Sequence, residues 1–306
     1  MLPATASVDL LHPHRLNTAM EIRARQRVIG LSKRPLLMGI VNVTPDSFFD
    51  GGRYLDPQAA MAHALRLVED GADLLDIGAE STRPGSVPVD EAEESRRLIP
   101  VVTAVARAVS VPISVDTSKA VVARAAIDAG AVIVNDVTAL RGDPAMVDLV
   151  VETGAGLVLM HMQGTPRTMQ RAPRYHDVVE EVGAFLAKRA RFAMERGIAK
   201  SQIMLDPGIG FGKVLVHNLE ILSRLRTFRK LGYPLLVGLS RKAFIGQLVE
   251  RPVEERLWGT AAAVALAVER GANILRVHDV AAMRDVVNMT ASICGRTISP
   301  SGKRDA

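Results

Sequence analysis

The chain has 306 residues, of which 48% are hydrophobic and 23% charged, a balance typical of a globular protein and unlike that of a disordered one. The net charge of +5 suggests anionic ligands, but aromatic residues make up only 4% and are not interleaved with basic runs, so we expect no nucleic-acid partner. The single cysteine, Cys294, excludes an internal disulfide and favours a reducing, cytoplasmic location, and we expect its thiol to be buried and inert.

The beginning of the chain differs in charge from the rest. Basic residues outnumber acidic ones over residues 1–34, but serine is sparse there, so a tail or strand that covers one end of the domain is favoured over an organelle transit peptide. The apolar run 261–268 is too short to span a bilayer, and no other stretch is longer, so we expect no membrane partner.

From residue 36 onward, short apolar runs alternate with longer helical patterns. We predict strands at 36–42, 74–79, 113–116, 132–136, 157–161, 203–206, 235–239 and 274–278. We predict helices at 57–70, 89–109, 119–129, 144–153, 177–196, 217–231, 254–270 and 280–294.

Eight strand–helix units without a low-complexity linker indicate a single (β/α)8 TIM barrel over residues 35–295, with a basic N-terminal extension at 1–34 and a C-terminal tail at 296–306. The alternative is an open doubly wound sheet, but no Gly-x-Gly-x-x-Gly turn follows the first strand.

Every predicted strand ends in polar or charged side chains. One such residue can simply cap the next helix, but eight on one rim are hard to explain as caps, and caps do not call for lysine, arginine or histidine. Because active sites of such barrels lie at the carboxyl ends of the strands, we expect the chemistry there. The strand ends are Asn42, 76–83, 116–117, 135–136, His161, 206–208, 240–242 and 276–279.

These side chains suggest two binding functions. Asp116, Asn135 and Asp206 offer acceptors and an amide suited to a flat heterocycle with several N–H groups. Arg276 and His278, two apart on a strand, would point to one face and could hold a phosphate or pyrophosphate together with Lys242 and Arg83.

Two other chemistries are weaker alternatives. His278 and Asp279 could mimic part of a hydrolase triad, but no Gly-x-Ser-x-Gly elbow supports this. The histidines lack the close spacing of a zinc site, whereas Mg²⁺ held mostly by substrate phosphates and touched by Asn42 would need few protein ligands.

The motifs resemble those of the dihydropteroate synthases, a family of pterin-binding folate-pathway enzymes inhibited by sulfonamides. The resemblance covers residues 35–295, and its most specific parts are Met38-Gly39-Ile40-Val41-Asn42-Val43-Thr44-Pro45-Asp46-Ser47-Phe48 and Asp76-Ile77-Gly78-Ala79-Glu80-Ser81-Thr82-Arg83-Pro84-Gly85. It implies condensation of 6-hydroxymethyl-7,8-dihydropterin pyrophosphate with para-aminobenzoate to give 7,8-dihydropteroate and pyrophosphate.

The resemblance also implies a role for each matching residue. Pterin would be bound by Asp116, Asn135, Met160, Asp206, Phe211 and Lys242. Pyrophosphate would be bound by Asn42, Thr82, Arg276 and His278, with Asn42 as the Mg²⁺ contact. Aminobenzoate would be bound by Phe48, Thr82, Arg83 and Pro84. Catalysis would fall to Asn42, Asp116, Lys242, Arg276 and His278.

The resemblance further implies a homodimer formed through the later helices. The sequence departs from the family at Ala243, where many relatives have serine, and at Val214, where a polar residue is common. Two alternatives stay open: a methyltetrahydrofolate:corrinoid methyltransferase, which would share the pterin acceptors, and a non-catalytic paralogue that binds pterin.

Overall fold

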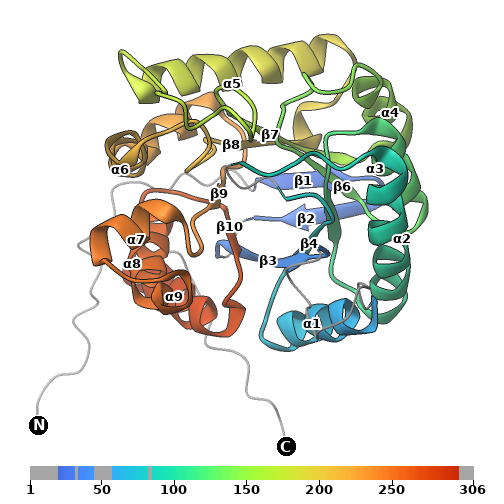
Figure 1. The fold of residues 1–306 in the computed structure, drawn as a ribbon, viewed down its shortest axis with the longest axis horizontal. Helices are drawn as coiled ribbons and strands as arrows, with labels where there is room; N and C mark the ends of the chain where they lie inside the picture. Colours follow the sequence, from blue (N-terminus) through green and yellow to red (C-terminus); the bar gives the residue numbers. More distant parts are fainter. Residues whose placement is uncertain (1–19, 32–33, 45–56, 82–84, 296–306) are drawn as a thin grey trace, which may run out of the picture.

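The computed structural model describes residues 20–31, 34–44, 57–81 and 85–295. Eight parallel strands form one sheet in the order β8-β7-β6-β5-β4-β3-β10-β9, and a Leu205–Leu235 bridge joins β8 to the β9 side, so that the sheet closes into a barrel (Figure 1). The TIM-barrel prediction is confirmed. The barrel strands are β3 (Leu36–Asn42), β4 (Leu74–Gly78), β5 (Ile113–Asp116), β6 (Ile133–Asp136), β7 (Gly156–Met160), β8 (Ile203–Asp206), β9 (Leu236–Gly238) and β10 (Ile274–Val277).

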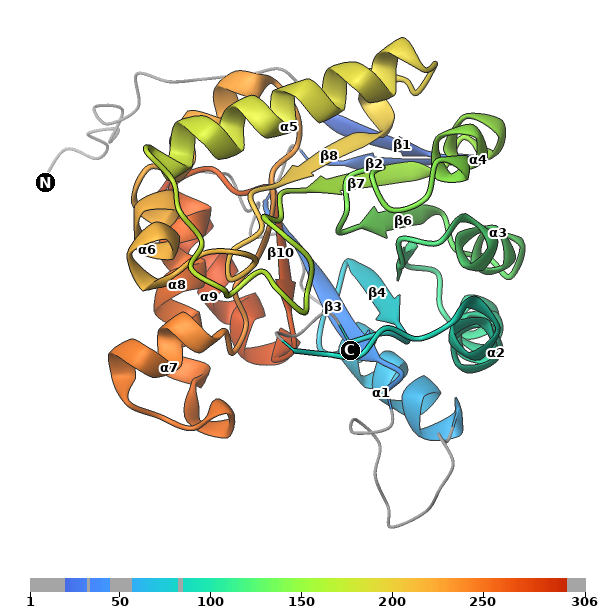
Figure 2. The same ribbon diagram turned by 45° about the horizontal axis from the view of Figure 1, so that its top comes forward.

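The helices surround the sheet, and Figure 2 shows α2, α3 and α4 side by side on one flank and α7, α8 and α9 on the other. Each α-helix except α8 follows a strand in the chain, as the alternating pattern predicts, and α8 follows α7 and the 3-10 turn η3. The α-helices are α1 (Pro57–Glu69), α2 (Glu91–Ala108), α3 (Ala120–Asp128), α4 (Ala145–Thr153), α5 (Val178–Glu195), α6 (Leu215–Ser223), α7 (Ala243–Val249), α8 (Leu257–Glu269) and α9 (Val280–Ile293).

The predicted helices at 217–231 and 254–270 are wrong in detail. The first is interrupted at Arg224 and continues as the 3-10 turn η2 (Leu225–Leu231), and the second begins at Leu257 after the turn η3 (Val253–Glu255). Helix α7 has no predicted counterpart because seven residues are too few to give a clear helical period. A third 3-10 turn, η1 (Lys200–Gln202), precedes β8.

Successive residues of each barrel strand point alternately to the outside and to the inside of the barrel, and the inward-pointing side chains form layers. Every second residue points inward. Apart from Ser114 on β5, the lowest inward layer is apolar, and its apolar members pack in one buried cluster: Met38, Leu74, Ile133, Val158, Met204, Leu236 and Ile274. Two residues further along the strands come Asp76, Asn135, Met160, Asp206, Gly238 and Arg276. The polar layer therefore lies directly above an apolar floor.

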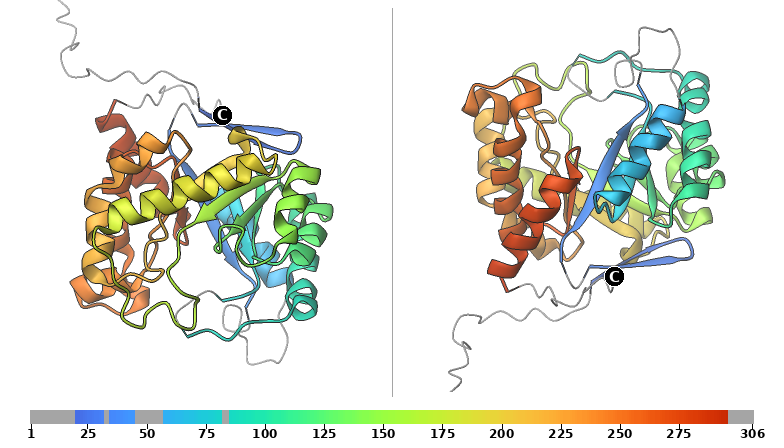
Figure 3. Two further views of the ribbon diagram at one scale, coloured as in Figure 1. Left: turned by 90° about the horizontal axis from the view of Figure 1, so that it is seen from above. Right: turned by 90° about the horizontal axis from the view of Figure 1, so that it is seen from below.

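A hairpin covers the amino-terminal end of the barrel, in agreement with the expectation of a covering strand. Strands β1 (Glu21–Ala24) and β2 (Arg27–Gly30) pair antiparallel and lie across the ends of the barrel strands (Figure 3). Ile22, Ala24 and Ile29 are buried in the same cluster as the apolar floor. The hairpin therefore completes the barrel core.

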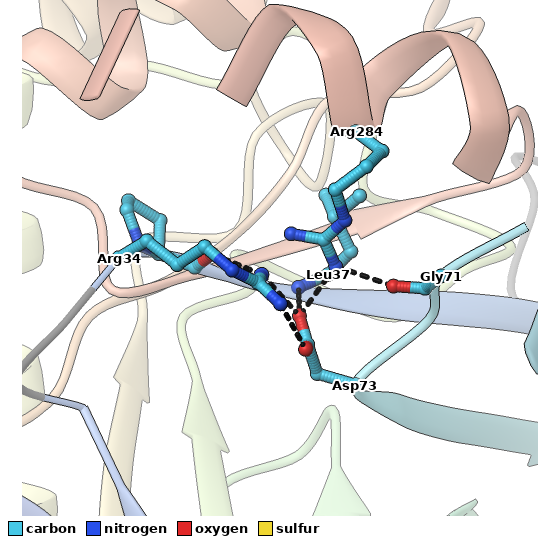
Figure 4. Close-up of polar contacts among 6 residues, drawn as sticks. Arg34, Leu37, Gly71, Asp73 and Arg284 are labelled. Carbon is cyan, nitrogen blue, oxygen red and sulfur yellow. Dashed lines mark hydrogen bonds and ion pairs between the residues drawn. The ribbon is translucent and has the colours of Figure 1, made fainter. Parts of the chain in front are cut away.

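A polar cluster joins the start of the barrel to its last helix (Figure 4). The Asp73 carboxylate accepts two bonds from the Arg34 guanidinium, at 2.8 and 2.9 Å, one from Arg284 at 2.6 Å and one from the Leu37 N–H at 2.8 Å. Arg284 also donates to the Gly71 carbonyl. These contacts fix β3, the α1–β4 connection and α9 to one another.

Two expectations about environment have different outcomes. Cys294 is partly exposed at the end of α9, so the prediction of a buried thiol is wrong; the last turn of α9 extends past the core. Among the described residues, no helix is both long and apolar enough to cross a membrane.

Candidate active site

The carboxyl end of the barrel holds a hollow of about 340 Å³ that is lined by residues of six strands, β5 to β10, and of the loops that follow β6, β8 and β9. Seven residues predicted for the site line it: Asp116, Asn135, Met160, Asp206, Phe211, Lys242 and Arg276. A larger hollow of about 700 Å³ lies between the hairpin and the opposite end of the barrel. Among the described residues, only Arg27 and Asp73 are charged in its lining, and Asp73 is already bound by two arginines, so we place the chemistry at the carboxyl end.

Arg276 connects the charged side chains of the polar layer at the bottom of the hollow. Its Nε lies 2.6 Å from Asp76 Oδ2 and its Nη2 lies 3.0 Å from Asp116 Oδ2. The Asn135 amide also donates to Asp76 Oδ2, at 3.1 Å. The charges therefore hold one another in place across the barrel, from β4 to β10, before any ligand binds.

Burial changes the proton affinities of the pocket residues. Burial raises the pKa of Asp206 to about 6, opposed by the Gly208 N–H bond and by the Lys242 and Lys213 cations. Burial also raises the pKa of Asp116, and the Arg276 guanidinium opposes this rise. Burial and the Arg276 charge lower the pKa of Lys242 to about 8. Perturbed groups that converge in one hollow are typical of a functional site.

The loop after β8 forms one wall of the hollow. Gly208, Gly210 and Gly212 have φ of 66°, 83° and 62°, a backbone conformation that favours glycine. This tight path brings the Phe211 ring within 4.2 Å, centroid to Nζ, of Lys242. A cation over an aromatic face is attracted to it, so the wall and the amine position each other.

The buried side chain of Lys213 holds this loop in place through hydrogen bonds to its backbone. Its side chain is 2% exposed, and Nζ donates to the carbonyls of Gly208 (2.9 Å) and Phe211 (3.0 Å) and lies 2.9 Å from His161 Nδ1. Burial, followed by the Lys213 charge, lowers the pKa of His161, so the imidazole is neutral and accepts the bond. His161 therefore supports the loop and does not line the hollow.

The remaining predicted residues lie elsewhere. Asn42 ends β3 and His278 follows β10, both on the same rim, but neither lines the hollow. The His278 N–H donates to Ser240 Oγ at 3.1 Å, and its Nδ1 lies 3.0 Å from the same oxygen. The four residues expected around aminobenzoate lie outside the described residues: Phe48, Thr82, Arg83 and Pro84.

Two residues that support the site had no role assigned from the sequence, although Asp76 was among the polar strand ends. Asp76 is fully buried and anchors Arg276, and Lys213 anchors the loop. A charged residue inside the apolar run 74–78, in the same inward layer as Asn135 and Asp206, was the available signal for Asp76. Nothing in the spacing of Lys213 indicates that it folds back under its own loop.

Metal ligands are few. Within the described ranges, no group of three or more His, Cys, Asp or Glu residues could hold a metal ion. The amide oxygen of Asn42 on the rim is the type of hard ligand that Mg²⁺ accepts, and such an ion could bind with one protein ligand if substrate phosphates supplied others.

Comparison with known proteins defines the class of protein first. The model of the family "Pterin binding enzyme" matches residues 38–278, so this barrel with its polar hollow is a pterin-binding enzyme. A dihydropteroate synthase of Haemophilus influenzae is 45% identical over 270 residues, which cover 88% of this chain and 98% of the relative.

Solved structures agree. Two are of the Xanthomonas albilineans dihydropteroate synthase. The one with 4-aminobenzoic acid is 48% identical with a TM-score of 0.85, covering 90% of this chain and 98% of that one. The one with 7,8-dihydropteroate is 47% identical with a TM-score of 0.80, and the match covers 89% of this chain and 98% of that one. The Yersinia pestis enzyme in a sulfonamide complex is 43% identical with a TM-score of 0.85, covering 90% and 100%.

The chain belongs to the dihydropteroate synthase family, whose members are transferases of a pterinylmethyl group in folate biosynthesis.

Proposed function

We propose that the hollow at the carboxyl end of the barrel binds 6-hydroxymethyl-7,8-dihydropterin pyrophosphate and transfers its pterinylmethyl group to para-aminobenzoate, releasing pyrophosphate. One observation carries this proposal: two carboxylates, an amide and an amine converge in one hollow that the Met160 and Phe211 side chains also line. A pterin ring has the complementary groups, namely N–H donors, ring acceptors and two flat apolar faces.

Each pocket residue has a role in binding the pterin. The Asp206 and Asp116 carboxylates accept N–H bonds from the amino-pyrimidine edge, as a carboxylate accepts from a guanidinium. The Asn135 amide both donates and accepts, and the Lys242 amine donates to a ring acceptor. The Asp206 Oδ1 already accepts the Gly208 N–H at 2.7 Å, so this carboxylate is held in place before the ring arrives.

Two cationic or polar groups at the carboxyl end act on the leaving group: Arg276 and His278 bind the pyrophosphate. A Mg²⁺ ion that accompanied the pyrophosphate would be held by Asn42 and by the phosphates, and it would neutralise phosphate charge. Loss of pyrophosphate leaves a pterin-stabilised cation at the methylene carbon, which the Asp116 carboxylate stabilises. The arylamine nitrogen then forms a bond to this carbon and releases one proton to solvent, so that no dedicated general base is needed. Thr82, Arg83, Pro84 and Phe48 bind the aminobenzoate, and sulfonamides compete there.

The enzyme is proposed to work as a homodimer in the cytoplasm. Large apolar side chains are exposed on the adjacent helices α8 and α9, among them Trp258 (81%), Met289 (65%) and Ile293 (70%), and they support a second copy as the covering surface. The single cysteine, which permits no internal disulfide, supports a reducing compartment. We also propose the division into an extension at 1–34, the barrel at 35–295 and a tail at 296–306.

The test measures pyrophosphate release from the pterin substrate with and without para-aminobenzoate, and identifies the product as 7,8-dihydropteroate. Release that depends on para-aminobenzoate is expected. Methyl transfer from methyltetrahydrofolate would favour the methyltransferase alternative. Binding of pterin pyrophosphate with no turnover under either condition would favour a non-catalytic paralogue. Asp206→Ala is expected to abolish the thermal stabilisation that pterin pyrophosphate gives to the unsubstituted protein.

A further inference from the structure

Arg241 stands between two residues of the site and has an unusual backbone. It follows Ser240, which contacts His278, and precedes Lys242, which lines the hollow. Its φ of 59° lies in the left-handed region, which is unfavourable for a residue other than glycine. Its N–H donates to the buried Thr260 hydroxyl at 3.1 Å, and its carbonyl accepts from Arg256 at 3.1 Å. The surrounding structure therefore maintains this conformation.

The Arg241 side chain forms a two-pronged ion pair with Asp279. Nε lies 3.0 Å from Oδ2 and Nη2 lies 2.5 Å from Oδ1. Asp279 is also the residue that precedes α9, where an aspartate commonly accepts a backbone N–H of the first helical turn. Its side chain makes no such capping bond. The carboxylate is therefore engaged by Arg241 in place of the helix.

The two loops are consequently joined at two successive positions. Ser240 contacts His278, and Arg241 contacts Asp279. One loop carries Lys242, assigned above to the pterin ring, and the other carries His278, assigned to the pyrophosphate. Pterin and pyrophosphate are the two ends of one substrate, and the bond that breaks lies between them.

We propose that Arg241 and Asp279 are positioning residues that fix the distance between the Lys242 amine and the His278 imidazole. This inference rests on the proposed function. Neither residue needs to contact the substrate. By holding the loops in register, the pair allows both ends of pterin pyrophosphate to be bound at once, and a misplacement of about 1 Å at such a site can lower the rate about a hundredfold.

The test compares Asp279→Asn, Arg241→Lys and Arg241→Gly with a matched control. Arg124 and Glu152 form a similar two-pronged pair between the outer helices α3 and α4, and neither residue lines the hollow, so Arg124→Ala is the control. Arg241→Gly suits the left-handed backbone and removes only the side chain. Arg241→Lys keeps the charge but loses the planar fork.

For each variant we would measure the melting temperature, kcat and KM for pterin pyrophosphate, and the dissociation constants of 6-hydroxymethylpterin alone and of pyrophosphate alone. We expect kcat/KM to fall about tenfold to a hundredfold, while the affinities for the two separate fragments stay within about twofold of the unsubstituted protein. The Arg241→Gly, Asp279→Asn double variant should lose no more than the more impaired single variant, because the two residues act as one unit. Arg124→Ala should change none of these values.

Two results would overturn the inference. One is kinetics of Arg241→Gly and Asp279→Asn equal to those of the control. The other is a parallel loss of affinity for both fragments with a lower melting temperature, which would indicate a merely structural pair. If the unsubstituted protein released no pyrophosphate, the proposed function would fail, and the affinity for pterin pyrophosphate relative to the two fragments would still test the pair.

Discussion

Replacement of Asp206 by asparagine should stabilise the free protein while removing its pterin binding. Asp206 is 6% exposed, and burial raises its pKa from 3.8 to about 6. Asparagine has nearly the same shape, and its carbonyl oxygen can still accept the Gly208 N–H bond that Oδ1 accepts at 2.7 Å. The substitution therefore removes a buried charge and keeps the contact that positions the side chain.

The magnitude follows from linkage between protonation and folding. A rise of about 2 in the pKa of Asp206 means that the ionised carboxylate lowers the unfolding free energy by about 3 kcal/mol at neutral pH. Because the folded pKa lies above the unfolded one, this cost is complete above about pH 6 and absent below about pH 4. The Lys242 and Lys213 cations lose a partner in the variant, so about 3 kcal/mol is an upper limit.

Urea unfolding without ligand measures the effect at pH 7.5 and at pH 4. We expect the unfolding free energy of Asp206→Asn to exceed that of the unsubstituted protein by about 1–3 kcal/mol at pH 7.5 and by much less at pH 4. Calorimetric titration should show that the variant no longer binds the pterin. Asp128→Asn, at an exposed residue of α3, is the control and should show neither effect. A variant that is less stable at pH 7.5, or a difference independent of pH, would refute the reasoning.

Three further predictions concern the same pocket. Pterin affinity should fall about tenfold per pH unit below about pH 6, as the Asp206 carboxylate that accepts the ring N–H groups becomes protonated; titration calorimetry from pH 5 to 8 measures this. Gly208→Ala should lower the unfolding free energy by more than about 2 kcal/mol and abolish activity, because the new Cβ would lie 2.0 Å from the His161 carbonyl oxygen at a φ of 66°. Lys213→Met should cost about 2–4 kcal/mol in urea unfolding by leaving buried acceptors without a donor. Because burial lowers the folded pKa of Lys213 from 10.5 to about 7, the unsubstituted protein should gain stability as pH rises from 7 to 10, and the variant should lose this gain.

Controls for these predictions come from the same chain. Gly30→Ala introduces a Cβ with no atom within 4 Å at an ordinary φ, so it should be nearly neutral. Lys188→Met removes an exposed lysine of α5 and should not change the pH dependence of stability. A flat pterin affinity between pH 5 and 8, an active Gly208→Ala protein, or an unchanged stability of Lys213→Met would contradict the respective prediction.

The barrel was predictable because its strands are apolar on both faces and its helices have clear periods. The runs 36–42 and 113–116 became β3 and β5 with the same bounds, since buried parallel strands need continuous apolar residues. Helix α7 was not predictable, because seven residues give too short a period. The hairpin was foreseen only as a covering strand, since its four-residue strands give little pattern.

The residues that line the hollow were largely predictable, but the residues that hold them in place were not. Asp116, Asn135, Asp206 and Arg276 lie near the ends of apolar strands and Lys242 follows one, and the topology brings their side chains to one hollow. His161 had the same position in the pattern, yet its side chain turns away to accept from Lys213. That difference depends on how a distant loop folds back, which strand periodicity does not encode.

The hairpin at the amino-terminal end has a kinetic consequence. The apolar floor, packed against Ile22, Ala24 and Ile29 of the hairpin, closes the barrel below the polar hollow within the described residues, so a ring bound beside Asp206 arrives and leaves through the carboxyl end. Under the proposed function, an arylamine bound above the pterin then blocks its exit. Substrates should therefore bind in a compulsory order, pterin pyrophosphate first, and pterin pyrophosphate already bound should be trapped by saturating arylamine in an isotope-trapping experiment.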